Sequence, residues 1–273
     1  MSTSTSTARP TRRSIVRGAA WTVPVVSVAA VAPAYAASCN RRTNQVLDWD
    51  GPNVTYVRTS ATEAYALYDP DLTGPLPALR LDVKAAYAGN MKAGNEFNND
   101  TSQTMVVQAV VGGIAMSGLG FMQATTSAAP TNTKGEPDGY GDRGTYTFTF
   151  GQPVSNLVFT LTDIDSTSND FRDALVISGG FTPEFTAPGV ELFVNNANGN
   201  GNQTTPDRWY QSVSASAAVD DTAGSNGNLR VKFAGPVSTF AITYWNRQSA
   251  YDAGTDTNQR IFVSDMTFDY KPC

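Results

Sequence analysis

Four aspartates near the end of a strand-like segment are the residues best suited to chemistry. Asp163 and Asp165 stand two positions apart, so on a strand their carboxylates would project to the same side. Asp170 and Asp173 follow shortly and can return two more oxygens. Oxygen ligands of this kind bind Ca²⁺, so the spacing predicts a calcium site, with Ca²⁺ as the only cofactor expected. The ligand order of an EF-hand is absent, and the alternative is a solvated loop in which aspartates cap turns.

Aromatic residues beside amides suggest a second kind of site, a platform for carbohydrate. Sites for small polar ligands place a few convergent polar groups against aromatic faces. Trp209 and Tyr210 follow an Asn-rich stretch, and Trp245 directly precedes Asn246. Neighbouring residues on a strand face opposite sides, so one ring of each aromatic pair is expected in the core and the other outside it. We expect Trp209 and Trp245 to be the exposed rings, with core packing as the alternative for each.

The residue inventory restricts catalysis. The 273 residues include no histidine and two cysteines. This excludes Ser-His-Asp and Cys-His nucleophile pairs, His-ligated zinc and four-Cys metal sites. Paired carboxylates remain a means of glycoside hydrolysis, but no catalytic motif selects such a pair here. The expectation is therefore a non-catalytic protein, with a secreted hydrolase that uses carboxylates as an alternative.

The first 36 residues have the pattern of an export signal. Arg12 and Arg13 precede a moderately apolar run over residues 19–32, which closes on Ala34-Tyr35-Ala36. Signal peptidase reads small residues at such positions, so the pattern predicts a twin-arginine signal peptide that is cut after Ala36. A transmembrane anchor would need about 20 predominantly apolar residues, and this run is shorter and contains prolines. Lipidation of Cys39 is another alternative, although no large aliphatic residue precedes it.

Charge and cysteine positions extend this expectation. Residues 1–36 contain four arginines and no acid, which leaves 15 basic against 24 acidic residues and a net charge of −9 in residues 37–273. Such a chain is repelled by nucleic acid and by anionic bilayers, so neither is an expected partner. A disulfide between Cys39 and Cys273 would join the two ends of the exported chain and contribute about 5 kcal/mol in the chain-entropy model. No hydrophobic anchor follows, so release to the medium or cell surface is expected.

The elements that must position these residues are strands. Apolar and polar residues alternate with period two between Gly, Pro, Asn and Asp, as in half-buried antiparallel strands. The clearest segments are 145–150, 157–161, 229–233, 240–244 and 261–268. We predict an all-β fold, an antiparallel β-sandwich of the jelly-roll type, over residues 37–273. Residues 40–126 supply either extra strands of the same sheets or a small separate domain.

Two segments of the sequence are similar to each other. Residues 150–160 align without gaps on residues 233–243, and both contain Phe followed three positions later by Pro-Val-Ser. The pattern is interpreted as two hairpins, each with a tight turn through Pro-Val-Ser, in related places of the sandwich. The alternative is that a β-protein repeats such hairpins without a structural relation between them.

The same segments carry a resemblance to other proteins. Phe150 to Asp165, Pro236 to Asn246 and the closing segment Gln259 to Phe268 resemble a group of uncharacterised secreted and surface proteins of actinobacteria and related bacteria. The resemblance covers roughly residues 144–270 and implies a β-sandwich module. It implies no activity and transfers no catalytic residue.

Together these features predict a secreted β-sandwich that acts without catalysis at the cell surface or in the medium. Its expected role is a carbohydrate-binding or surface-binding module, with a polysaccharide or a cell-surface component as partner. A structural or adhesive protein without a small-molecule site is the competing hypothesis. The aromatic platform distinguishes the two, because only the binding module needs an exposed ring beside convergent polar groups.

Overall fold

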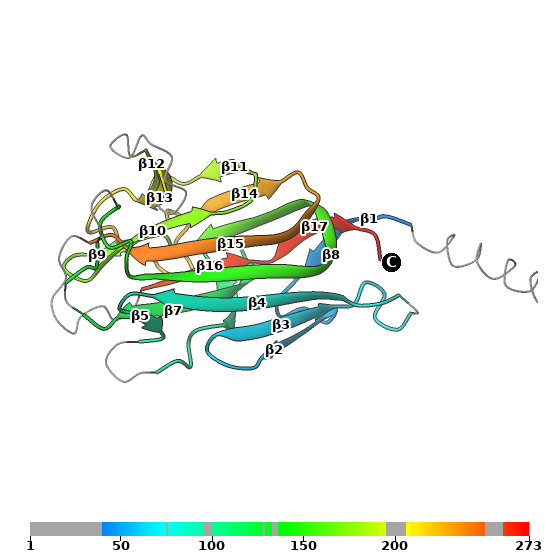
Figure 1. Ribbon diagram of the computed structural model, residues 1–273. Helices are drawn as coiled ribbons and strands as arrows, with labels where there is room; N and C mark the ends of the chain where they lie inside the picture. Colours follow the sequence, from blue (N-terminus) through cyan, green and yellow to red (C-terminus); the bar gives the residue numbers. More distant parts are fainter. Residues whose placement is uncertain are drawn as a thin grey trace, which may run out of the picture. The chain divides into compact units, whose positions relative to one another are not determined.

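Alternating apolar and polar residues form antiparallel strands throughout the part of the chain that the structure describes (Figure 1). This computed structural model describes residues 40–74, 76–95, 100–127, 129–132, 136–194, 206–248 and 259–272. The predicted signal segment and both cysteines, Cys39 and Cys273, lie outside these residues. No helix within the described ranges is long and apolar enough to cross a membrane.

The described residues form seventeen strands: β1 (Arg42–Leu47), β2 (Val54–Arg58), β3 (Glu63–Tyr68), β4 (Leu79–Ala88), β5 (Met91–Ala93), β6 (Val106–Val111), β7 (Met116–Thr125), β8 (Arg143–Thr162), β9 (Ser166–Thr167), β10 (Phe171–Ile177), β11 (Phe181–Thr186), β12 (Val190–Val194), β13 (Arg208–Ser212), β14 (Leu229–Phe233), β15 (Val237–Asn246), β16 (Arg260–Ser264) and β17 (Met266–Tyr270).

The strands form two facing layers. The first has the order β2-β3-β4-β8-β15-β10-β13-β12. In the second layer, β14 lies between β11 and β8. On its other side β8 pairs with β16 and with β17, which follow each other along the chain. Beside these, β7 pairs with β16 and carries β6, and β1 pairs with β17. The predicted antiparallel β-sandwich is confirmed, and the strands before residue 126 belong to the same two sheets.

Strand β8 belongs to both layers. Its residues 143–150 pair with β4 and β15, whereas its residues 154–162 pair with β14, β16 and β17. The second similar segment passes between the layers in the opposite direction, from β14 through Ala234–Pro236 to β15. The prediction of two hairpins is therefore wrong, because each Pro-Val-Ser segment forms a corner between sheets. The two corners lie side by side, with Val154 opposite Val237.

Large apolar side chains fill the space between the layers. Phe148 and Phe240 stack with ring centroids 4.6 Å apart, and Phe159 lies 5.1 Å from Phe240. All three rings are at most 2% exposed. Burying one such ring contributes about 1.5–3 kcal/mol, so these contacts between layers are a principal stabilising feature of the sandwich. The same core continues to the edge formed by β10, β11 and β13, where the candidate site lies.

Candidate ligand-binding site

Three of the four predicted calcium ligands are buried beside the end of β8. Asp163 and Asp165 directly follow this strand and are 5% and 6% exposed, and Asp173 on β10 is fully buried. Asp173 Oδ1 accepts hydrogen bonds from the Tyr244 hydroxyl at 2.6 Å and from Gln259 Nε2 at 3.1 Å. Its Oδ2 accepts one from the Asp165 backbone N–H at 3.2 Å. The strand ends therefore bring these carboxyls together inside the protein.

Burial changes the ionisation of this cluster. Burial first, and then the charges of Asp165 and Asp173, raise the pKa of Asp163 to about 8, against the lowering effect of Arg260. Burial also raises the pKa of Asp165 to about 6. The pKa of Asp173 is raised well above its usual value by burial and by repulsion from Asp165. The raised pKa of Asp163 favours its protonated form at neutral pH, and burial acts in the same direction on Asp173.

This arrangement does not support the predicted calcium site. Asp165 Oδ2 accepts a hydrogen bond from the Val219 backbone at 2.8 Å, so its oxygen is engaged within the protein. Asp170 lies at the turn before β10, where its carbonyl accepts a hydrogen bond from Asn246 Nδ2 at 3.0 Å. Among the described residues, no group of three or more His, Cys, Asp or Glu side chains could hold a metal ion. Asp165 and Asp173 are instead hydrogen-bonded within the protein, and Asp163 is buried with its Oδ1 unpaired among the described residues.

The expected exposure of Trp209 and Trp245 is wrong, because both rings are buried. Trp209 is 2% exposed, Trp245 is 0% exposed and Asn246 is 1% exposed. The Trp209 and Trp245 rings meet with centroids 6.0 Å apart. Asn246 Oδ1 accepts a hydrogen bond from the Arg172 backbone at 3.1 Å, so this amide joins β15 to β10.

A loop that covers the outer face of the first sheet explains the burial of Trp245. Tyr140 packs against this ring edge to face with centroids 5.1 Å apart, and Trp245 Nε1 donates to the Asp138 carbonyl at 3.1 Å. Gly139 has a φ of +75°, and a Cβ there would collide with the Asn246 carbonyl oxygen. The absence of a side chain at Gly139 therefore lets the loop lie directly on the sheet.

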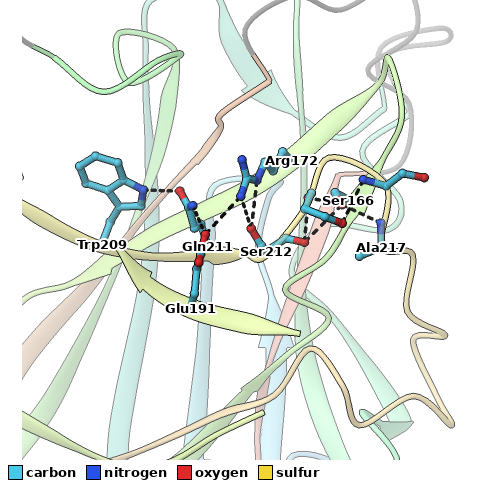
Figure 2. Close-up of polar contacts among 9 residues, drawn as sticks. Ser166, Arg172, Glu191, Trp209, Gln211, Ser212 and Ala217 are labelled. Carbon is cyan, nitrogen blue, oxygen red and sulfur yellow. Dashed lines mark hydrogen bonds and ion pairs between the residues drawn. The ribbon is translucent and has the colours of Figure 1, made fainter. Parts of the chain in front are cut away.

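Polar contacts fix the β12–β13 hairpin to β10 (Figure 2). Trp209 Nε1 donates to Gln211 Oε1 at 2.8 Å, and Gln211 Nε2 donates to Glu191 Oε1 at 2.5 Å. Arg172 of β10 donates to the Ser212 carbonyl at 2.7 Å and to Glu191 at 3.3 Å. Because these side chains are hydrogen-bonded to one another, the hairpin is held in a defined position at the edge of the sheet.

A pocket with a volume of about 470 Å³ lies where the two sheets end. One wall comes from β11, the last strand of the second sheet, and the other from β10, β12 and β13 of the first. Ligand sites for small molecules typically have volumes of about 300–1,000 Å³ and mostly apolar walls. The lining residues are Val176, Ile177, Phe181, Pro183, Leu192, Arg208 and Tyr210.

Strand pairing explains which side chains face this pocket. Tyr210 lies opposite Leu175 on one side and opposite Leu192 on the other, so all three project towards the space between the sheets. Phe181 reaches from β11 to within 6.2 Å of the Tyr210 ring, measured between centroids. Two residues from Tyr210 on the same face, Arg208 also lines the pocket and is exposed to solvent.

The Tyr210 hydroxyl and Arg208 are the polar groups of the pocket. Burial raises the pKa of Tyr210, and the charge of Arg208 opposes this rise. Tyr210 therefore stays a neutral hydrogen-bonding group at physiological pH, and Arg208 supplies positive charge. Leu192 is 45% exposed, so the apolar surface is open to solvent at this edge.

Of the residues that line this pocket, only Tyr210 belongs to a pattern that the sequence singles out. Leu192 and Phe181 carry no motif, and their side chains meet only because the ends of two separate sheets lie together. One sequence signal could have pointed to these residues. They are apolar residues in short edge strands, at positions that the alternation places outside the core.

Comparison with known proteins does not assign this site. No family model matches the chain, and no curated protein matches it significantly.

Proposed function

We propose that this protein is an exported, non-catalytic binding module that holds an amphiphilic ligand in the pocket between β11 and the β12–β13 hairpin. The observation that carries the proposal is an open, mostly apolar pocket of about 470 Å³ with Arg208 among its lining residues. The N-terminal pattern with Arg12 and Arg13 supports export. Release to the medium or the cell surface remains part of this proposal.

The pocket lining favours one class of ligand. A sugar ring needs several hydrogen-bonding groups around it, whereas this pocket offers the Tyr210 hydroxyl and Arg208 among apolar walls. An apolar chain would fill the space beside Phe181 and Leu192, and an anionic head would pair with Arg208. The proposed ligand is therefore a single-chain amphiphile with an anionic head group, a different class of ligand from the polysaccharide expected from the sequence.

Strand pairing also supports the proposed disulfide. Strands β1 and β17 are antiparallel, with Arg42 opposite Tyr270. Each of these residues lies three positions from a cysteine, Cys39 and Cys273 respectively. A disulfide between the two cysteines in an oxidising compartment remains part of this proposal.

Thermal unfolding with decanoate tests the proposed ligand class. Below its micelle concentration, decanoate is expected to raise the unfolding midpoint, because a ligand that binds only the folded state stabilises it. Decanol, with the same chain length and no charge, should raise it less. Leu192→Asp places a charge in the apolar wall and should abolish the shift. Arg208→Gln should lower the affinity for decanoate about tenfold and leave decanol unchanged.

Val106→Asp provides the matched control. Val106 is an exposed apolar residue, 40% accessible, on β6, and it does not line this pocket. The control variant should respond to decanoate as the wild type does. Equal decanoate shifts in the wild type and in Leu192→Asp would reject the pocket as the binding site.

A further inference from the structure

Arg247 lies on the outer face of the first sheet, on the opposite side of β13 from the pocket. Its backbone N–H donates to the Arg172 carbonyl at 2.7 Å, which fixes it beside the start of β10. Its guanidinium carbon lies 4.8 Å from the centroid of Phe193 and 5.7 Å from that of Trp209. The Phe193 and Trp209 rings stack with centroids 4.6 Å apart. Arg247 therefore lies over an aromatic pair.

Charge compensation at Arg247 is incomplete within the described residues. Its Nε is buried and has no hydrogen-bond partner. The neighbouring Arg172 differs, because Glu191 and the Ser212 carbonyl accept its hydrogen bonds. No carboxylate of the described chain forms an ion pair with Arg247. A partly buried guanidinium without a hydrogen-bonded anion is costly to maintain, and an unsatisfied group of this kind can mark the place of a water or an ion.

The surrounding charges and the shape of the donor groups limit the kind of anion that fits. Arg172 lowers the pKa of Arg247, after the larger effect of burial, whereas Asp138 and Glu191 raise it. One cation and two carboxylates therefore act on Arg247. The repulsion of these acids opposes the attraction of Arg247 and Arg172 for any anion, so the shape of the donor groups decides which anion fits. A planar carboxylate also matches the two parallel N–H donors of a guanidinium.

We propose that Arg247 anchors a second binding site for the carboxylate of a hydrophilic ring, as in a uronic acid sugar. The carboxylate pairs with the guanidinium, and the sugar ring packs against the half-buried Phe193. This site is separate from the pocket, because Trp209 projects to one face of β13 and its neighbours Arg208 and Tyr210 project to the other. It does not depend on the proposed function.

Calorimetric titration with sodium glucuronate, and with glucose as the uncharged probe, tests this site. Glucuronate is expected to bind the wild type at least tenfold more tightly than glucose does. Arg247→Gln should lose at least tenfold in glucuronate affinity, and Arg247→Lys should lose an intermediate amount because it keeps the charge without the planar fork. Arg80→Gln, at an exposed arginine of β4 that belongs to neither proposed site, is the matched control and should bind glucuronate normally.

A variant that is expected to raise the affinity for glucuronate distinguishes lost binding from a folding defect. Asp138→Asn removes a negative charge near Arg247 while its backbone carbonyl still accepts from Trp245, so glucuronate affinity should rise severalfold. Equal affinities for glucuronate and glucose would overturn the proposal. Unchanged binding in both Arg247→Gln and Asp138→Asn would overturn it as well.

Discussion

Raising the pH from 4 to 8 is expected to destabilise the folded protein progressively. The pKa of Asp163 is raised from its model-compound value of 3.8 to about 8, and that of Asp165 to about 6. Above pH 4 the unfolded chain releases these protons, whereas the folded chain retains them. The free energy of unfolding therefore falls by about 1.4 kcal/mol per pH unit for each such group, until the pH passes its folded pKa.

For Asp163 alone this window runs from about pH 4 to pH 8 and corresponds to a loss on the order of 5 kcal/mol. Asp173 adds to the same trend, because its pKa is also raised. The carboxylate of Asp269, whose pKa is lowered by hydrogen bonds from Asn156 and Asn44 and by Arg41, acts in the opposite direction below pH 4. Urea unfolding at intervals of one pH unit measures the combined slope.

Asp163→Asn is the variant that isolates this effect. Asp163 has a φ of +68°, in the left-handed region that asparagine tolerates better than most residues, so the backbone conformation is retained. The amide cannot ionise, and the stability of the variant should change less between pH 6 and pH 8 than that of the wild type. An identical slope for the two proteins would contradict the assignment of Asp163 as a protonated carboxyl.

Replacing Trp245 by alanine is expected to lower the free energy of unfolding by about 3–5 kcal/mol, since the ring is fully buried between Tyr140 and Trp209. The variant also leaves the Asp138 carbonyl without its indole donor. An exposed platform residue would instead change stability by about 0.5 kcal/mol or less. Urea unfolding at one pH separates these two outcomes.

Phe185→Ala serves as the control for this measurement. Phe185 is an aromatic residue of similar chemistry, but it is 52% exposed on the edge strand β11. Its loss should change the free energy of unfolding by less than about 1 kcal/mol. Comparable effects of Trp245→Ala and Phe185→Ala would contradict the buried position of Trp245.

The strands were predictable because their alternation is a local property of the chain. Residues 229–233 and 145–150 were expected as strands and lie within β14 and β8. The corners at Pro153 and Pro236 were misinterpreted as hairpin turns, because a strand that bends between two sheets has the same local sequence as one that turns back. Which strand pairs with which depends on contacts distant in sequence.

The candidate site was harder to predict for a related reason. Alternation places Tyr244 and Trp245 on opposite faces of β15, and they do lie on opposite faces. It does not reveal that the loop containing Gly139 covers the outer face, which buries Trp245 as completely as Tyr244. Likewise, the spacing of Asp163 and Asp165 indicated a carboxyl cluster, but their ionisation depends on burial that the tertiary fold creates.

Chemical-shift mapping by NMR of the isotope-labelled protein during titration with decanoate tests the central claim most directly. The proposed binding module predicts that the largest saturable changes occur at the backbone amides of residues 176–177, in β11 and in the β12–β13 hairpin, around Leu192 and Tyr210. The chemical shifts of the amides of β6, which pairs with β7 and does not line the pocket, should not change. Absence of saturable changes, or changes centred away from the β11 and β12–β13 edges, would contradict it.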